Sequence, residues 1–348
     1  MIKDPLLFSN LESISRIFAY KLGYNIINAG YTTNQSLENI LITIEKELFN
    51  LTNNIRPNTT STIANVLNDL FSELKERFLD PRLPGLSSGF TELDQLTQGF
   101  QKSDLIILAG RPSMGKTALS LTIALNCIKV SRLPILFCSL EMSKQQILYR
   151  LLASETGINQ MKLKSGQLNQ NDWIKLNKIM RIISKLPFFI NDNSVLLVQQ
   201  IRSEIKTILL EQNTLGLVII DYLQLMQGSN FRQGNRVQEL SQITRDLKNL
   251  AREFNIPIIA LSQLSRNVDT RVDQRPILSD LRESGSIEQD ADLVLMLSRS
   301  KTLYSSDPSL YLQTTNLINT ELIVAKQRNG PTGTINLKFN KTRIKFLN

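Results

Sequence analysis

Short apolar runs alternate with amphipathic stretches over the part of the chain that begins near Gly89. The runs that predict strands are Leu105–Ala109, Ile135–Leu140, Phe188–Asn191, Leu217–Asp221, Pro257–Ser262, Leu293–Leu297 and Leu322–Lys326. The earlier runs are apolar throughout and are separated by helical stretches such as Ala118–Val130, which is typical of parallel strands buried on both faces. Thr334–Phe339 and Arg343–Leu347 predict a closing antiparallel hairpin. The expected fold class is α/β, a mostly parallel sheet with helices on both faces.

The N-terminal part of the chain has a helical pattern instead. Apolar residues at helical spacing predict two helices, about Asn10–Asn28 and Ser36–Leu51, whose hairpin is too small to bury its own apolar face. Thr52–Thr62 is rich in Asn and Thr and predicts a linker, and a third amphipathic helix follows over Ile63–Phe78. This third helix packs either on its own domain or on a neighbouring subunit, and periodicity does not separate the two. The expected domains are a helical hairpin over 1–52, a linker with a docking helix over 53–88 and a main domain over 89–348.

Composition narrows the chemistry. Of 348 residues, 42% are hydrophobic and 20% are charged, which suits a folded protein with a substantial core. Lys and Arg total 40 against 31 Asp and Glu, and the resulting charge of +9 is compatible with a polyanionic partner. Histidine is absent from the sequence, which excludes Ser-His-Asp triads and His-ligated zinc. Cys127 and Cys138 fall in a predicted helix and a predicted strand, where we expect small buried side chains rather than catalysts.

Targeting signals are not evident. No apolar stretch approaches membrane-spanning length, and Met1–Asn10 lacks the charged-then-apolar layout of a secretory signal. We therefore expect no membrane association and a reducing compartment.

The strongest motif follows the first predicted strand directly. It has the pattern G-x-x-x-x-G-K-[ST] and consists of Gly110, Arg111, Pro112, Ser113, Met114, Gly115, Lys116 and Thr117. The two glycines allow the backbone N–H groups to wrap around a β-phosphate. Lys116 can then reach the β- and γ-phosphates, and the Thr117 hydroxyl can coordinate Mg²⁺. A glycine-rich turn before a helix is the alternative, but strand, loop and helix occur in the required order. The motif therefore predicts binding of a nucleoside triphosphate.

Two carboxylates stand at the ends of predicted strands. Asp221 ends Leu217–Asp221, where a phosphate-loop enzyme holds its Mg²⁺ shell; on its own, such an aspartate would be a helix cap or a turn residue. Glu141 follows Ile135–Leu140 and could orient or deprotonate the attacking water. Its alternative role is in capping the next helix, and we favour catalysis because no histidine competes.

A neutral amide and two cations complete the set of candidates at strand ends. Gln263 could contact the γ-phosphate and register its loss, although the residue pattern alone favours a turn amide. Lys326 and Arg328 precede a tight turn, where charged side chains commonly only extend into solvent. They could also act as fingers on transition-state charge, in cis or from a neighbour.

Two basic segments could bind nucleic acid. Gly228–Arg236 reads as a flexible, basic segment with one aromatic residue and contains Arg232 and Arg236, and Ser279–Gly285 follows an Arg-bearing stretch. Such loops can hold a sugar-phosphate backbone through Arg and backbone N–H groups without distinguishing the bases.

Taken together, these segments resemble the motor domain of bacterial DnaB-type replicative helicases, which are RecA-like ATPases. The resemblance covers roughly residue 60 to the C-terminus. The strings that carry it are Gly89–Asp94, Arg111–Thr117, Ser139–Ser143, Ile220–Met226, Leu261–Arg266, Leu278–Asp292 and Lys326–Pro331. The family implies a homohexameric ring that binds ATP and Mg²⁺ and translocates 5′→3′ on single-stranded DNA at a fork, with a primase and a loader as further partners. The main domain would accordingly be a RecA-like ATPase domain.

The resemblance also implies roles for individual residues. Lys116 and Thr117 would bind phosphate and Mg²⁺, Glu141 would activate water, Asp221 would support the metal and Gln263 would sense the γ-phosphate. Arg150 matches the position at which the family stacks an arginine on the base. Lys326 and Arg328 would act in trans on the adjacent subunit's γ-phosphate. Arg282, Glu283 and Gly285 would lie in a loop that contacts DNA in the central channel, and Ile63–Phe78 would dock on the next subunit.

The N-terminal region departs from the family pattern. Family members carry a globular helical domain ahead of a helical hairpin, and here we expect only the hairpin. This departure puts the ring collar and primase docking in doubt and leaves the ATP site unaffected. Abundant Asn, Ile, Leu and Lys indicate an A+T-rich genome, so the expected location is the plastid stroma or, otherwise, the bacterial cytoplasm. A RecA-like recombinase filament and a nucleotide-gated DNA-binding protein without motor activity are the alternatives.

Overall fold

The computed structural model describes residues 84–226, 236–271, 273–281, 285–299 and 317–348, and positions 23, 24, 27, 63, 67, 70–72, 74, 75 and 78. The chain divides into two units, Met1–Pro81 and Arg82–Asn348. In the first unit, the described positions are helical, both within the expected hairpin and within the expected docking helix. The rest of the hairpin and of the linker lies outside the described residues.

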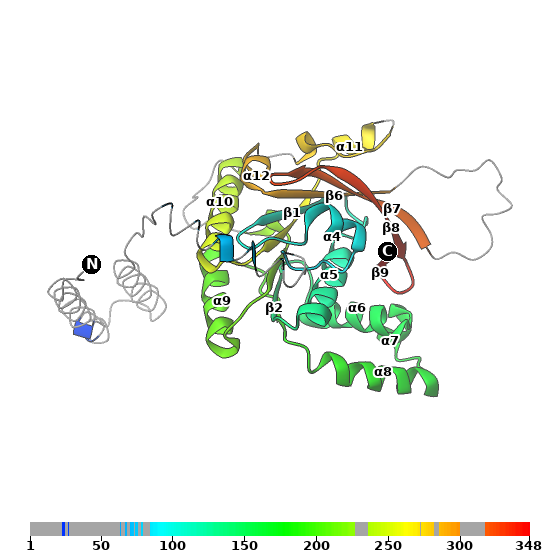
Figure 1. The fold of residues 1–348 in the computed structure, drawn as a ribbon. Coiled ribbons are helices and arrows are strands. Elements are labelled where there is room, and N and C mark those ends of the chain that lie inside the picture. Colours follow the sequence, from blue (N-terminus) through cyan, green and yellow to red (C-terminus); the bar gives the residue numbers. More distant parts are fainter. Residues whose placement is uncertain are drawn as a thin grey trace. The chain divides into compact units, whose positions relative to one another are not determined.

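The second unit is built on one mixed sheet. Its strands are β1 (Leu105–Gly110), β2 (Ile135–Ser139), β3 (Phe188–Asn191), β4 (Leu217–Asp221), β5 (Ile258–Gln263), β6 (Leu293–Arg299), β7 (Leu317–Gln327), β8 (Gly333–Asn340) and β9 (Lys345–Leu347). They are arranged in the order β3-β2-β4-β5-β1-β6-β7-β8-β9 (Figure 1). Strands β1 to β6 are parallel, whereas β7, β8 and β9 are added antiparallel. The predicted fold class and the closing hairpin are confirmed.

Helices connect the parallel strands and cover both faces of the sheet. They are α4 (Thr91–Thr97), α5 (Lys116–Ser131), α6 (Lys144–Thr156), α7 (Gln160–Ser165), α8 (Gln170–Ile183), α9 (Val198–Gln212), α10 (Arg236–Phe254), α11 (Asn267–Thr270) and α12 (Gly285–Asp290), with short 3₁₀ turns η1 (Leu223–Leu225) and η2 (Leu278–Asp280). Within the described residues, no helix has both the length and the apolarity needed to cross a membrane.

Strand β1 shows how the apolar runs divide between the two faces. Leu105, Ile107 and Ala109 belong to the core cluster that contains the buried residues of α9 and α10. Ile106 and Leu108 belong to the opposite cluster, which contains those of α5. Because consecutive side chains point to opposite faces, a strand with a core on each side must be apolar at every position. This requirement explains why the runs were recognisable in the sequence.

Element boundaries differ from the prediction where apolarity alone does not mark them. Helix α5 begins at Lys116 rather than Ala118, because the last residues of the phosphate loop form its first turn. Strand β7 begins at Leu317, five residues before Leu322, where the predicted strand begins. Exposed Leu317 and Asn319 alternate with half-buried Ile318 and buried Thr320, so this part of the strand has one exposed face and lacks continuous apolarity. The two cysteines are buried, as predicted.

Gly89 tests how closely the segment before β1 packs against helix α5. It has φ +78°, and a Cβ at this position would lie 2.4 Å from Cβ of Asn126 on α5. Gly166, with φ +72°, has no atom within 4 Å of such a Cβ. We expect Gly166→Ala to cost about 1–2 kcal/mol for its left-handed backbone alone. Gly89→Ala should cost at least about 2 kcal/mol more, because it adds a steric clash in a close-packed region. Thermal unfolding of the two variants measures the difference, and equal losses would contradict the packing described.

Candidate functional site

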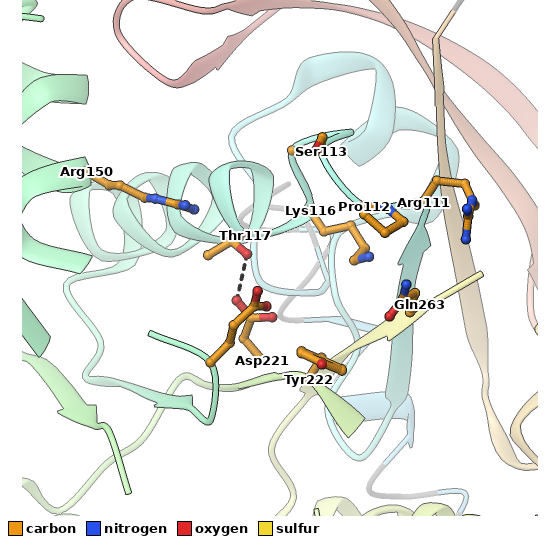
Figure 2. Close-up of a pocket in the computed structure, with 11 residues that line it drawn as sticks. Arg111, Pro112, Ser113, Lys116, Thr117, Arg150, Asp221, Tyr222 and Gln263 are labelled. Atoms are coloured by element: carbon orange, nitrogen blue, oxygen red, sulfur yellow. Dashed lines mark hydrogen bonds between the residues drawn. The ribbon is translucent and has the colours of Figure 1, made fainter. Parts of the chain in front are cut away.

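A cavity of about 400 Å³ opens at the carboxyl ends of the parallel strands β1, β4 and β5. Ligands in open α/β sheets bind at this edge, because the loops that follow the strands meet there. The cavity is lined by Arg111, Pro112, Ser113, Gly115, Lys116, Thr117, Glu141, Arg150, Asp221, Tyr222 and Gln263. Figure 2 shows the labelled side chains converging from the ends of β4 and β5, from α6, and from the loop before α5 together with the first turn of α5. The structure thus brings together residues that the sequence placed on five separate segments.

The phosphate loop joins β1 to α5, and its backbone needs special conformations. Ser113 has φ +64° and Gly115 has φ +97°, both in the left-handed region. At Gly115 a Cβ would also lie 3.2 Å from the ring of Phe346, so the loop and β9 pack closely. Met114 is partly buried against the core on this side of the sheet and does not line the cavity. Gly115 is therefore required both by its left-handed backbone conformation and by the lack of space for a side chain.

Lys116 extends along the mouth of the loop. Its Nζ donates a hydrogen bond of 2.6 Å to the carbonyl oxygen of Gly110, the last residue of β1. Burial lowers the pKa of Lys116, and Arg111 lowers it further, whereas Asp221 and Glu141 oppose the shift. A partly desolvated ammonium of this kind gains stability from an anion placed beside it.

The Thr117 hydroxyl donates a hydrogen bond of 2.7 Å to Oδ2 of Asp221 (Figure 2). Asp221 ends β4 and is only 1% exposed. Burial raises its pKa to about 6, and the charge of Glu141 contributes to the rise, whereas Thr117, Lys116 and Arg150 oppose it. A buried carboxylate and a hydroxyl in contact are oxygen donors suited to Mg²⁺, which prefers one or two protein ligands together with phosphates. Among the described residues, no cluster of three or more acidic or cysteine side chains offers a complete protein cage for a metal.

Glu141 and Gln263 reach the cavity from the ends of β2 and β5, which lie on either side of β4. Glu141 lies just beyond β2, where the Leu140 amide donates to the Asp221 carbonyl at 2.7 Å and extends the pairing of β2 with β4. Gln263 is the last residue of β5, and its amide donates to Oε1 of Gln224 at 3.3 Å. Nε2 of Gln224 donates to the Ser262 hydroxyl at 2.9 Å, so Gln224 holds the end of β5 in place.

Arg150 projects into the cavity from α6 (Figure 2). Its Nε is buried and has no hydrogen-bond partner, and burial lowers its pKa despite the opposing charges of Asp221 and Glu141. A buried donor without a partner is costly, and a bound ligand would satisfy it. Arg111 is engaged differently: it donates to both carboxylate oxygens of Asp269, at 3.1 and 2.5 Å, and to the Leu264 carbonyl at 3.0 Å.

Tyr222 lines the cavity but was not singled out in the sequence. Burial raises its pKa, with smaller contributions from Glu141 and Asp221. Its position directly after Asp221 was the available signal.

The two candidate fingers lie away from this cavity. Nζ of Lys326 donates to the carbonyls of Glu288 and Ala291, at 2.5 and 2.8 Å, at the end of α12. The Arg328 amide donates to the Asp292 carbonyl, and the Asp292 amide donates to the carbonyl of Leu105, the first residue of β1. The phosphate loop follows the last residue of β1, and six residues of strand span roughly 17–20 Å. Arg328 therefore lies at the amino ends of the parallel strands, whereas its own chain's cavity lies at their carboxyl ends.

The residues predicted to bind DNA are only partly described. Arg232, Arg282 and Glu283 lie outside the described residues, and Gly285 is the first residue of α12. Arg236 begins α10, where its guanidinium pairs with Glu239 and donates to the carbonyls of Gln224 and Met226 at 2.8 and 3.0 Å. These bonds occupy the guanidinium within the chain, and the role of Arg236 on DNA stays a prediction.

The parallel sheet, the loop between β1 and α5 and the Asp221 carboxylate define a RecA-like domain of the phosphate-loop class. Residues 85–348 match the family of DnaB-like helicase C terminal domains, and the chain belongs to this family of ATP-dependent helicases. It is 61% identical to the probable replicative DNA helicase of Trieres chinensis, over 94% of this chain and 71% of that protein. It is 42% identical to the replicative DNA helicase DnaB of Geobacillus stearothermophilus, over 93% of this chain and 70% of that protein. A solved DnaB-like replicative helicase, described with its primase interactions, aligns with a TM-score of 0.79 at 34% identity, over 97% of this chain and 76% of that one. The predicted resemblance is confirmed.

The raised pKa of Asp221 predicts a pH-dependent stability of the nucleotide-free protein. The carboxylate is less stable in the folded chain, so its cost is absent below pH 4 and is fully present above pH 6. A rise in the pKa from 3.8 to about 6 corresponds to about 3 kcal/mol, so Asp221→Asn should stabilise the protein by about 1–3 kcal/mol at pH 8. The gain should disappear as the pH falls from 6 towards 4. Thermal unfolding of both proteins in EDTA measures it, and a gain that is independent of pH would contradict the assignment.

Proposed function

We propose that this chain is the motor subunit of a replicative DNA helicase that hydrolyses ATP and travels 5′→3′ along single-stranded DNA at a fork. The observation that carries the proposal is the cavity that joins the phosphate loop, the Thr117–Asp221 pair, Glu141 and Gln263. Membership of a family of ATP-dependent helicases supports it, as does the net charge of +9. The likeness to replicative helicases over more than nine-tenths of the chain favours a helicase over a recombinase.

Each group at the cavity has a distinct task in the proposed hydrolysis. Loop amides and Lys116 bind the phosphates and neutralise the charge that develops on them. Thr117 and Asp221 would hold Mg²⁺, which supplies electrophilic stabilisation of the phosphate oxygens. Glu141 orients and deprotonates the attacking water, because it is the carboxylate at the cavity that makes no bond to Thr117. Gln263 contacts the γ-phosphate and registers its loss, and Arg150 stacks on the base.

The location of the candidate fingers supports a ring of identical subunits. Arg328 lies a strand's length from its own cavity, and the ammonium of Lys326 is bound to the Ala291 carbonyl near the same end of β1, so a role at the γ-phosphate requires an adjacent subunit. The described part of the docking helix supports assembly, because it exposes large apolar side chains to solvent. Ile63, Leu67, Leu70, Phe71, Leu74 and Phe78 are each at least half exposed. An apolar helix face of this kind gains free energy by packing against a second copy of the chain. We therefore include a homohexamer in the proposal.

DNA would pass the segment that contains Arg282, Glu283 and Gly285, held through its phosphates rather than its bases. We add a primase as a partner, since a solved DnaB-like replicative helicase is described together with its interactions with primase. The resemblance to the family adds a loader. We propose a plastid location for two reasons. The chain is rich in residues that A+T-rich codons encode, and a relative of 61% identity comes from a diatom.

The decisive experiment is unwinding of forked DNA. The purified protein should unwind a fork with a 5′ tail in the presence of ATP and Mg²⁺, and single-stranded DNA should stimulate its ATPase. Lys116→Ala should weaken nucleotide binding and unwinding together, because the loop loses its cation. ATP binding without DNA-stimulated hydrolysis would favour a regulatory DNA-binding protein. Open filaments in electron micrographs would favour a recombinase, and a protein that stays a single copy under every nucleotide condition would contradict the motor.

Arg328 tests the location of the finger. Arg328→Ala should leave the Kd for ATP nearly unchanged and reduce hydrolysis by roughly 10³-fold or more, because transition-state charge loses its partner. Mixing Arg328→Ala with Glu141→Gln, each inactive alone, should restore part of the turnover in mixed rings, where an intact Arg328 faces an intact Glu141. Arg252→Ala, which removes an exposed arginine near Arg328, is the matched control and should behave like the wild type. Near-normal turnover of Arg328→Ala would contradict the assignment.

A further inference from the structure

A buried carboxylate, Asp292, lies behind the proposed finger, outside the nucleotide cavity. Its side chain is 7% exposed and directly precedes β6. Its Oδ2 accepts the amide of Leu105 at 2.9 Å and the ammonium of Lys248, and its Oδ1 lies 3.3 Å from Nη1 of Arg328. Its backbone also bonds to the backbones of Leu105 and Arg328. This one residue therefore connects the start of β1, helix α10 and the end of β7.

The surroundings keep Asp292 fixed. Lys248 is itself only 12% exposed and donates a second bond, of 2.7 Å, to the Ser103 carbonyl. A buried charge pair is retained only when its remaining donors and acceptors are satisfied, and the Leu105 amide and the Ser103 carbonyl do so here. Asp104 lies nearby, with its carboxylate 3.9 Å from the ammonium of Lys248. The carboxylate of Asp292 thus has one orientation, set by the sheet rather than by solvent.

Arg328 is held by two anchors on one side of its guanidinium. Nη1 pairs with Asp292, and Nη2 donates to the Gln289 carbonyl at 2.8 Å. The side chain nevertheless remains 44% exposed. A guanidinium has five N–H donors in a rigid plane, so two anchors fix its direction and leave donors for a ligand outside. A free arginine on a turn would lose rotamer entropy each time it engaged a phosphate.

We propose that Asp292 is a positioning residue for ATP hydrolysis: it orients Arg328 of its own subunit toward the nucleotide of the neighbour. The inference rests on the proposed trans role of Arg328 and adds the group that makes this finger rigid. Lys248 supports it by balancing the charge of Asp292. The residue acts on kcat, because a correctly directed guanidinium matters only where charge develops in the transition state.

The test compares Asp292→Asn and Asp292→Glu with Asp290→Asn. Asp290 is a matched control, since its carboxylate lies near the same end of α12 but approaches Thr244 and Arg245 instead. We expect Asp292→Asn to lower the DNA-stimulated kcat by about 10–100-fold, with KM and the Kd for ADP changed less than about twofold. Affinity for ADP with aluminium fluoride, a mimic of the transferring phosphoryl group, should fall by a similar factor. Asp290→Asn should match the wild type in each measurement.

Combination with Arg328→Ala distinguishes positioning from a general structural effect. If Asp292 acts through Arg328, adding Asp292→Asn or Asp292→Glu to Arg328→Ala should cause no further loss, although either change slows the otherwise intact protein. Asp292→Glu keeps the buried charge and displaces the guanidinium, so it decides the matter if Asp292→Asn does not fold. Additive losses, or normal turnover in a folded Asp292 variant, would overturn the inference while leaving a slow Arg328→Ala to support the proposed function. Fast turnover in Arg328→Ala would instead contradict the trans finger itself.

Discussion

The hydrogen bond between Thr117 and Asp221 joins the two halves of the nucleotide site, and the remaining groups are arranged around it. Asp221 is buried at the end of a central strand, where an ionised carboxylate is poorly solvated and its pKa rises to about 6. Lys116 and Arg150 are desolvated on the same cavity, so the pKa values of both cations are lowered. These charges are held in a poorly solvated place before any ligand arrives. A preorganised site of this kind stabilises transition-state charge without reorganising solvent during the reaction.

The fold was predictable because the central strands have a core on each face. Ile106 and Ile107 pack into different clusters, which requires a continuously apolar run. The phosphate loop was predictable because its function depends on local backbone conformation, as the positive φ of Gly115 shows. Strand β7 was only half recognised, because its early residues are exposed on one face and lack the continuous apolarity of the central strands.

Contacts between residues distant in sequence could not be predicted in the same way. Gln224 positions the end of β5 across 38 residues of chain, and Asp292 reaches the start of β1 across 187. Neither residue lies in a pattern with regular spacing, since each is selected by the strand order rather than by its neighbours in sequence. Tyr222 was missed for a simpler reason: an aromatic residue after a strand resembles any other partly buried side chain. The partners of Lys326 and Arg328 likewise became visible only when α12 was placed beside β7.

The sheet also explains why the proposed finger would serve a neighbouring subunit rather than its own. Strand β1 begins beside Asp292 and ends at the phosphate loop, and this separation of roughly 17–20 Å exceeds the reach of an arginine side chain. Arg328 is anchored where the parallel strands begin, whereas phosphate would bind where they end. It can therefore meet a phosphate only at the strand ends of another subunit. Head-to-tail contacts of this kind form a ring when the rotation between subunits closes. The same strand holds the phosphate loop at one end and, through Asp292, Arg328 at the other. In the proposed ring, hydrolysis and assembly would therefore depend on a single rigid element.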